Sequence, residues 1–196
     1  MEGVLGKVYT LLARQIVEDY QVERGICVEI GSGDGRLGLE IAKLTELHVY
    51  MVDINGDALR KALRNAQEAD LSDRITAIQA RAEQLPFADG SADLVVSRGS
   101  IFFWEDKSKG LREIHRILKE GCVAFVGGGL SRYISERERR EFIEARMAAL
   151  GDEESRREWM RLRSPGYFRR ILRQAGIRDF KLIIDPPGIW AEIWKR

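Results

Sequence analysis

The chain has 196 residues, 44% of them hydrophobic, which suits a single folded domain with a buried core. Its 32 basic and 31 acidic side chains leave a net charge of +1, so no overall field favours nucleic acid or an anionic membrane as a partner. The two cysteines show no metal-ligand spacing, and no apolar run approaches the roughly 20 residues of a membrane span, which favours a cytoplasmic protein with no metal site, secretion signal or membrane anchor.

The first two thirds of the chain alternate between two hydrophobic patterns. Five short apolar runs have the length and composition of buried strands, and they cover 26–30, 48–52, 75–78, 94–97 and 123–126. Other segments carry apolar residues at helical spacing, and we expect helices over about 5–20, from 37, from 58 and over 111–118. Because strands alternate with helices, the sequence predicts an α/β fold, a Rossmann-like three-layer α/β/α sandwich around a parallel sheet.

The last third of the chain has a different composition. Residues 131–162 are dense in arginine and glutamate, which predicts one or two exposed helices that form a lid-like insertion. A further helix is expected to begin at Ser164-Pro165, because proline suits the first helical position. The segments 180–184 and 189–194, joined by the turn signal Pro186-Pro187-Gly188, predict a closing antiparallel hairpin. We expect all of this to form one domain over residues 1–196.

A glycine-rich turn follows the first predicted strand. Residues 31–35 read Gly-Ser-Gly-Asp-Gly, and glycines at this place let the backbone approach a ligand without a Cβ in the way. Asp53, at the end of the second predicted strand, can accept hydrogen bonds from both hydroxyls of a ribose. The pattern predicts a nucleotide-like ligand, but the spacing of residues 33–38 also fits the fingerprint of nicotinamide dinucleotides.

Several segments in the first two thirds of the chain resemble the class I S-adenosylmethionine-dependent methyltransferase family, in the family's order. In chain order they are EIGSGDG (29–35), VDI (52–54), ARAEQLPF (80–87), SADLVVS (91–97) and REIHRILKEG (112–121). The first two are similar to the family's cofactor motifs, the next two to its adenine-side loop and fourth strand, and the last to the helix and turn before its fifth strand. The C-terminal hairpin is similar to the family's antiparallel seventh strand beside the sixth. The resemblance implies a seven-stranded, mostly parallel sheet with an antiparallel C-terminal strand.

The same resemblance implies S-adenosyl-L-methionine as the cofactor and S-adenosyl-L-homocysteine as its product. It assigns the cofactor to residues at the strand ends: Glu29, Gly31, Ser32, Gly33, Gly35, Asp53, Ile54, Ala82, Glu83 and Ser97. Arg81 departs from the family pattern, because many relatives have an aspartate there that accepts from the adenine amino group, whereas a guanidinium only donates. Backbone groups around Ala82 and Glu83, or stacking of the Arg81 guanidinium, are the two remaining ways to hold the adenine.

The substrate is expected just past the fourth predicted strand, because ligands of open α/β sheets bind at the strand ends. Trp104 is predicted to line the substrate pocket and to offer its indole N–H. Phe102 and Phe103 fit a pocket wall and the core equally well.

Three more residues are substrate-side candidates. Arg98 fits either a carboxylate of substrate or cofactor, or an ion pair with Glu105 or Asp106. Tyr9 on the first predicted helix is a candidate lid residue, because relatives often use residues ahead of the first strand in this way. Tyr133 begins the insertion, and insertions at this place commonly shape the substrate pocket in relatives.

These features favour an enzyme that transfers a methyl group by in-line displacement to a small-molecule acceptor. The chain has two histidines and no Ser/His/Asp set, so the sequence identifies no general base. One alternative is an NAD(P)-dependent oxidoreductase on the same glycine turn, which would need a parallel sixth strand. Another is a non-catalytic S-adenosylmethionine-binding module, because fold alone does not fix function. No pattern in the sequence specifies the accepting atom or the oligomeric state.

Overall fold

A seven-stranded sheet forms the centre of the computed structural model, which describes residues 2–186 and 188–196. The strands are β1 (Ile26–Ile30), β2 (His48–Asp53), β3 (Ile75–Gln79), β4 (Ala92–Arg98), β5 (Leu118–Gly128), β6 (Phe180–Asp185) and β7 (Gly188–Trp194). Their order in the sheet is β3-β2-β1-β4-β5-β7-β6. Strands β1 to β5 pair in parallel, whereas β7 lies antiparallel between β5 and β6. The mostly parallel sheet and the closing hairpin are confirmed; Pro187 of the predicted turn lies outside the described residues.

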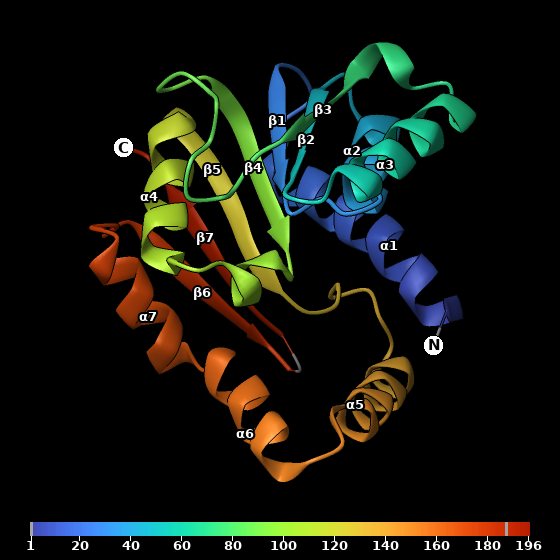
Figure 1. The fold of residues 1–196 in the computed structure, drawn as a ribbon, viewed down its shortest axis with the longest axis vertical. Helices are drawn as coiled ribbons and strands as arrows, with labels where there is room; N and C mark the ends of the chain where they lie inside the picture. Colours follow the sequence, from blue (N-terminus) through green and yellow to red (C-terminus); the bar gives the residue numbers. More distant parts are fainter. Residues whose placement is uncertain (1, 187) are drawn as a thin grey trace.

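Helices cover both faces of this sheet. They are α1 (Glu2–Tyr20), α2 (Arg36–Leu44), α3 (Gly56–Glu68), α4 (Lys107–Ile117), α5 (Glu136–Leu150), α6 (Glu153–Leu162) and α7 (Pro165–Gln174), with the short 3-10 helices η1 (Ser72–Arg74) and η2 (Ser100–Phe103). Helices α1, α2 and α3 lie on one face and α4 and α7 on the other (Figure 1). The predicted three-layer α/β/α fold is therefore confirmed. Among the described helices, none is long and apolar enough to cross a membrane.

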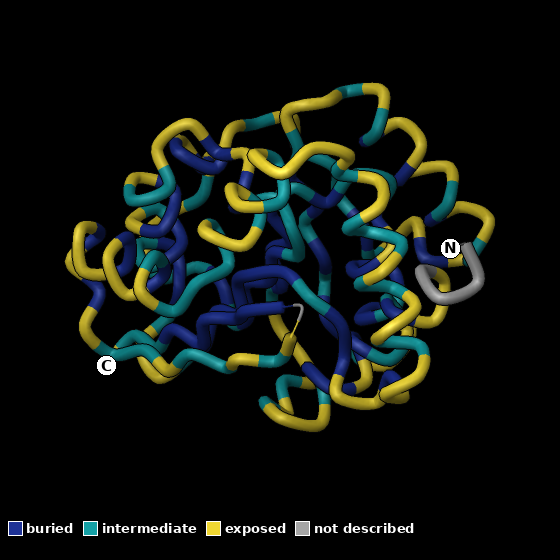
Figure 2. Tube along the Cα trace, turned by 90° about the horizontal axis from the view of Figure 1, so that it is seen from below, coloured by how far each residue is buried: buried dark blue, intermediate teal, exposed yellow. Residues whose placement is uncertain are grey.

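The core is divided by the sheet into two clusters of buried side chains. One joins the strands to α4 and α7 through residues such as Ile114 and Phe168. The other joins the opposite strand faces to α1, α2 and α3 through residues such as Leu12 and Ile41. The strands are buried between exposed helical surfaces (Figure 2). Because central strands bury both faces, they read as continuous apolar runs in the sequence.

Two elements begin earlier than the hydrophobic pattern predicts. Strand β5 begins at Leu118 rather than 123, and the apolar run does not reveal this because Lys119, Glu120 and Gly121 are polar or exposed and interrupt it. Helix α4 begins at Lys107, since the Asp106 side chain caps it by accepting a hydrogen bond from the Lys109 N–H at 2.9 Å. The apolar residues of α4 start only at Leu111, so periodicity could not reveal its first turn. Polar caps, not apolar spacing, set this boundary.

Helices α5 and α6 occupy the stretch that was expected to be helical and exposed. Neither buries any side chain fully. They lie beyond the end of the sheet at which β4 finishes (Figure 1). Strands β1, β2 and β4 run in parallel, so this is the carboxyl end of all three. The two helices are therefore on the side where ligands of open α/β sheets bind.

Candidate functional site

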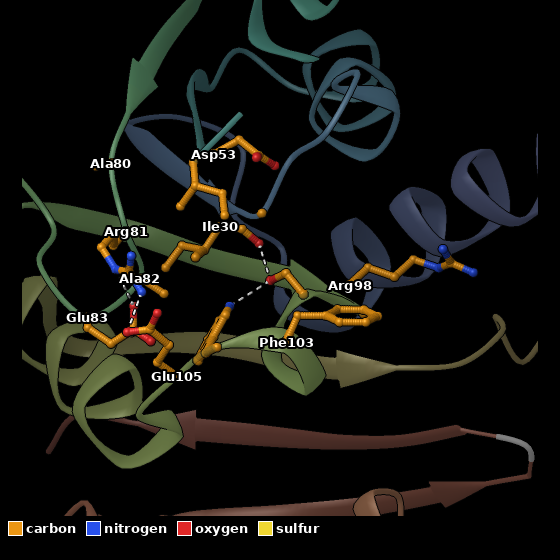
Figure 3. Close-up of a pocket in the computed structure, with 14 residues that line it drawn as sticks. Ile30, Asp53, Ala80, Arg81, Ala82, Glu83, Arg98, Phe103 and Glu105 are labelled. Atoms are coloured by element: carbon orange, nitrogen blue, oxygen red, sulfur yellow. Dashed lines mark hydrogen bonds and ion pairs between the residues drawn. The ribbon is translucent and has the colours of Figure 1, made fainter. Parts of the chain in front are cut away.

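A cavity of about 430 Å³ opens at the carboxyl ends of β1, β2 and β4. Figure 3 shows it from close by, with Asp53 on one side, Arg81 and Glu83 on another, and Phe103 beside Arg98. Its walls come from the loops that follow the three strands: Ile30, Gly31, Asp53, Ile54, Ala80, Arg81, Ala82, Glu83, Arg98, Gly99, Ser100, Phe103, Trp104 and Glu105. The volume is within the roughly 300–1,000 Å³ of small-molecule and cofactor sites.

Two glycines of the turn, Gly31 and Gly33, have different surroundings. A Cβ on Gly31 would lie 2.0 Å from the Ser100 Cβ, so this glycine lets the turn pack against η2. Gly33, with φ of +56°, has no atom within 4 Å of the place a Cβ would take. The turn itself is held by the Gly31 N–H, which donates to the Val52 carbonyl at 2.7 Å. Gly31 is therefore required by packing within the protein, whereas Gly33 keeps open space beside the backbone.

Asp53 connects β2 to the glycine turn. Its Oδ2 accepts a hydrogen bond from the Gly33 N–H at 2.8 Å, and its Oδ1 accepts one from the Asn55 N–H at 2.9 Å. Each carboxylate oxygen has a further lone pair. Because Asp53 lines the cavity, both oxygens can still accept from a ligand while the backbone fixes their orientation.

The wall opposite Asp53 is closed by charged side chains. The Arg81 guanidinium pairs with Glu105 at 2.6 Å and lies 3.8 Å from Glu83. The Glu83 side chain is buried and accepts a hydrogen bond from the Asp106 N–H at 3.1 Å. Arg81 thus joins the loop after β3 to the loop after η2 through a cross-loop ion pair with Glu105.

Ser100 is a cavity residue that the sequence patterns did not single out. Its hydroxyl donates to the Ile30 carbonyl at 2.9 Å, lies 2.7 Å from the Ser97 hydroxyl, and accepts from the Trp104 indole N–H at 3.1 Å. It therefore ties the ends of β1 and β4 to the first turn after them. The spacing Ser97-x-x-Ser100 was the only available signal. Trp104 lines the cavity as predicted, but its N–H is used inside the protein rather than offered to a ligand.

Arg98 points away from the charged wall and toward α1 (Figure 3). One guanidinium N–H donates to the Tyr9 hydroxyl at 3.2 Å, and the guanidinium carbon lies 4.8 Å from the centre of the Tyr9 ring. Of the two roles considered for Arg98, the ion pair with Glu105 or Asp106 is wrong, because Glu105 pairs with Arg81 and Asp106 caps α4. The Arg98 Nε is buried without a hydrogen-bond partner among the described residues. Arg98 is thus a cation at the cavity wall with an unused donor.

Glu29 lies beneath the glycine turn and not at the cavity wall. Its Oε2 accepts a hydrogen bond from the Gly38 N–H at 3.0 Å, so it satisfies one of the free donors in the first turn of α2. The side chain is 3% exposed. Burial raises the pKa of this carboxyl from 4.5 to about 8, with a smaller rise from the nearby Asp34 and Asp53 carboxylates. The pKa of Glu29 in the folded protein therefore lies well above that of an ordinary glutamate.

The raised pKa of Glu29 predicts that the free energy of unfolding depends on pH. The folded state keeps a proton on Glu29 up to about pH 8, whereas the unfolded chain releases it near its ordinary pKa, so ionisation of the unfolded state favours unfolding as the pH rises. The free energy of unfolding should fall by about 3–5 kcal/mol between roughly pH 4.5 and 8 from this group alone. Glu29→Gln should lack this loss, which urea unfolding at pH 5 and 8.5 measures. A pH-independent difference between the two proteins would show that Glu29 is ionised in the folded state.

The predicted site residues divide into those at the cavity and those away from it. The structure brings Gly31, Asp53, Ile54, Ala82, Glu83, Arg98 and Trp104 together at its wall. The others that the sequence assigned to ligands do not line it: Glu29, Ser32, Gly33, Gly35, Ser97, Tyr9 and Tyr133. Phe103 is a wall residue and 82% exposed, whereas Phe102 is 8% exposed and belongs to the core. No group of three metal-ligating side chains occurs in the described ranges.

Tyr133 is the clearest correction among the substrate-side candidates. Its hydroxyl donates to Glu18 on α1, and its ring lies under the guanidinium groups of Arg14 and Arg132, at 4.9 and 5.0 Å. Neighbouring Leu130 and Ile134 pack against Val8 of α1, which draws the chain after β5 along that helix. Tyr133 consequently lies on the outside of α1 and away from the cavity.

Comparisons with known proteins agree on one kind of domain. The family model described as "Methyltransferase domain" matches residues 28–126. The chain is 36% identical over 103 residues to the dimethylglycine N-methyltransferase of Parasynechococcus marenigrum (strain WH8102), covering 52% of this chain and 37% of that protein. It is 30% identical over 119 residues to the ubiquinone/menaquinone biosynthesis C-methyltransferase of Marinomonas sp. (strain MWYL1), covering 59% and 47%. The chain thus spans less than half the length of these two curated relatives.

The similarity to one solved structure extends over nearly the whole chain. A crystal structure from Methanococcus maripaludis, assigned as an S-adenosyl-L-methionine-dependent methyltransferase, matches with a TM-score of 0.85 and 33% identity. The match covers 99% of this chain and 88% of that one. The helices α5 and α6 are therefore included in the match, as well as the sheet.

Proposed function

Since this chain belongs to the class I S-adenosylmethionine-dependent methyltransferase family, we propose that it binds S-adenosyl-L-methionine in the cavity beside Asp53 and transfers the methyl group to a small-molecule acceptor. The observation that carries the proposal is the cavity itself, where the glycine turn, the Asp53 carboxylate and the loop 80–83 meet at the strand ends. The nearly balanced charge and the two free cysteines, Cys27 and Cys122, support a cytoplasmic enzyme acting on small molecules.

The residues at the cavity fit the chemical groups of this cofactor. Asp53 has acceptor capacity for the ribose hydroxyls, and the open space beside Gly33 admits a ligand close to the backbone. The guanidinium of Arg98, which lines the cavity and uses one N–H for the Tyr9 hydroxyl, is a donor group for a carboxylate such as that of the methionine portion. For the adenine, the available groups are the backbone around Ala82 and the apolar side chains of Ile30 and Ile54. Stacking of Arg81 is less favoured, because its guanidinium is held by Glu105.

Methyl transfer from a sulfonium requires little acid–base catalysis by the protein. When bound, S-adenosyl-L-methionine would supply a methyl group activated by its sulfonium, which a lone pair of the acceptor could take up while the carbon–sulfur electron pair stays on sulfur. The chain's own part is to orient the acceptor and exclude water, which is worth about 7–11 kcal/mol when reactants are well aligned. Trp104, fixed by Ser100, and Phe103 form the rigid apolar wall that can do this.

The competing dinucleotide hypothesis meets a specific obstacle in the sheet. It requires a sixth strand that pairs in parallel directly with the fifth, but here β7 is inserted between β5 and β6 and pairs antiparallel with both. Moreover, the glycine turn is followed by an α2 whose first free N–H groups include one already bound by Glu29. This leaves less of the helix N-terminus available for a pyrophosphate.

Isothermal titration with four nucleotides tests the proposed function. The purified protein should bind S-adenosyl-L-methionine and S-adenosyl-L-homocysteine and should not bind NAD or NADP under the same conditions. Binding of a nicotinamide nucleotide alone would overturn the proposal. Binding of the first two, with no methyl transfer to any acceptor in a screen that detects S-adenosyl-L-homocysteine release, would instead support a non-catalytic module.

A further inference from the structure

A second cavity, of about 410 Å³, lies between η2 and the helices α5 and α6. Phe103 lines this cavity as well as the first one. The side chain is 82% exposed, so a large aromatic ring stands uncovered at the boundary between them. An acceptor that reaches the first cavity from the side of α5 and α6 would pass along Phe103.

Arg163 is a charged group held by aromatic rings at this second cavity. Its guanidinium carbon lies 3.7 Å from the centre of the Phe102 ring and 4.1 Å from that of Trp159. One N–H group donates to the Trp159 carbonyl at 3.2 Å. A guanidinium has five N–H donors. Two aromatic rings therefore fix the plane of Arg163, while most of its donors have no partner in the described part of the chain.

Arg163 has no carboxylate partner within ion-pair distance in the described part of the chain. Burial, and to a smaller extent the positive charge of Arg146, which lines the same cavity, lower the pKa of Arg163 to about 10. Two glutamates also line the cavity, but both are exposed, and Glu158 is already paired with Arg161 at 2.6 Å. The two half-buried charged side chains of the cavity, Arg146 and Arg163, are thus both positive, whereas its two glutamates are exposed to solvent.

A further donor in the same cavity also lacks a partner. The Trp159 Nε1 is buried and makes no hydrogen bond within the described ranges. Leu150 and Leu162 add apolar surface to the lining. The cavity therefore combines fixed donors and positive charge with flat apolar walls.

We propose that the methyl acceptor is a small acid, whose carboxylate binds Arg163 together with Arg146 and whose flat apolar body lies along Phe103 toward the first cavity. A carboxylate matches the planar fork of a guanidinium, which can donate two parallel hydrogen bonds. The proposal rests on the proposed function, because it assigns a substrate class to the same reaction. It goes further in naming α5 and α6 as the elements that recognise the acid.

Calorimetric titration with 2-naphthoate and 2-naphthamide tests the proposal, because the two probes share the apolar body and differ in the charge. Each is titrated at pH 7.5 into the whole protein, with and without saturating S-adenosyl-L-homocysteine. We expect the acid to bind at least about tenfold more tightly than the amide, as hydrogen bonds to a charged group allow. Equal affinities, or no binding of the acid, would overturn the proposal.

Two arginine variants and a matched control identify the residues involved. Arg163→Gln and Arg146→Gln should each weaken binding of the acid about tenfold and leave binding of the amide unchanged. Arg157→Gln removes an exposed arginine of α6 that pairs with Glu153 outside the cavity, and it should change neither. If Arg163 only fastens α6 to η2, its variant will lower the unfolding temperature without altering the preference for the acid, and Arg146→Gln will then have no effect. The proposed function has a separate test in the same experiment. It would be overturned if the unaltered protein did not bind S-adenosyl-L-homocysteine.

Discussion

Gly33→Val is expected to abolish binding of S-adenosyl-L-methionine while the protein stays folded. A Cβ at Gly33 meets no protein atom within 4 Å, and the Gly33 N–H donates to Asp53 of the cavity wall, so the valine side chain stands beside the carboxylate proposed to hold the ribose. The left-handed backbone at this position, φ of +56°, adds strain of about 1–2 kcal/mol for a residue with a Cβ. Because a folded domain has about 5–15 kcal/mol of stability, the strain alone should not unfold the chain. Calorimetric titration and thermal unfolding measure the two effects separately.

Gly90→Val is the matched control for this variant. Gly90 also has a left-handed backbone, φ of +61°, and no atom within 4 Å of the place a Cβ would take. It precedes β4, at the opposite end of the strand from the cavity. Both variants should therefore lose similar stability, and only Gly33→Val should lose binding. Retained affinity in a folded Gly33→Val protein would place the cofactor elsewhere.

The fold was predictable because its signals are local and repeated. Strand β1 covers the expected residues 26–30, since a strand buried on both faces leaves an unbroken apolar run between polar neighbours. Asn55 caps α3 as expected, with its side chain accepting from the Asp57 and Ala58 N–H groups. Boundaries that depend on pairing rather than on pattern were missed. Strand β5 starts at Leu118, which pairs with Ala92 of β4, but the ladder is irregular over the next residues and resumes at Val123 beside Leu94, so no apolar run in the sequence marks this start.

Within the candidate site, the sequence could place only those residues at the cavity wall that directly follow a strand, such as Gly31 and Asp53. The glycine turn and Asp53 follow their strands directly in sequence, so the fold brings them together wherever the strands are adjacent. The substrate side depends on segments far apart in the chain. Nothing near Arg98 in the sequence indicates that its partner is Tyr9 on α1, and nothing near Phe102 indicates Arg163. Such contacts depend on how the helices pack against the sheet. Short sequence patterns do not predict this packing.

Asp53→Ala should weaken S-adenosyl-L-methionine binding by about 1.5–3 kcal/mol, since this is the usual contribution of hydrogen bonds to a charged acceptor. At about 1.4 kcal/mol for each factor of ten, the dissociation constant should rise between roughly tenfold and 150-fold. The variant also removes the acceptors of the Gly33 and Asn55 N–H groups, so a looser glycine turn could produce part of the loss. Asp53→Asn separates the two effects, because the amide keeps one carbonyl oxygen for the backbone and loses the charge.

Asp34→Ala completes the comparison, because Asp34 is a carboxylate on the same turn that pairs with Lys61 at 3.1 Å and does not line the cavity. Loosening of the turn by itself should weaken binding in this variant too. Loss of ribose contacts should weaken binding only when Asp53 is changed. We expect calorimetric titration to give an unchanged dissociation constant for Asp34→Ala, an intermediate one for Asp53→Asn and the weakest binding for Asp53→Ala. An unaltered constant in a correctly folded Asp53→Ala protein would refute the ribose assignment, since no other carboxylate of the described cavity wall lies at the end of β2.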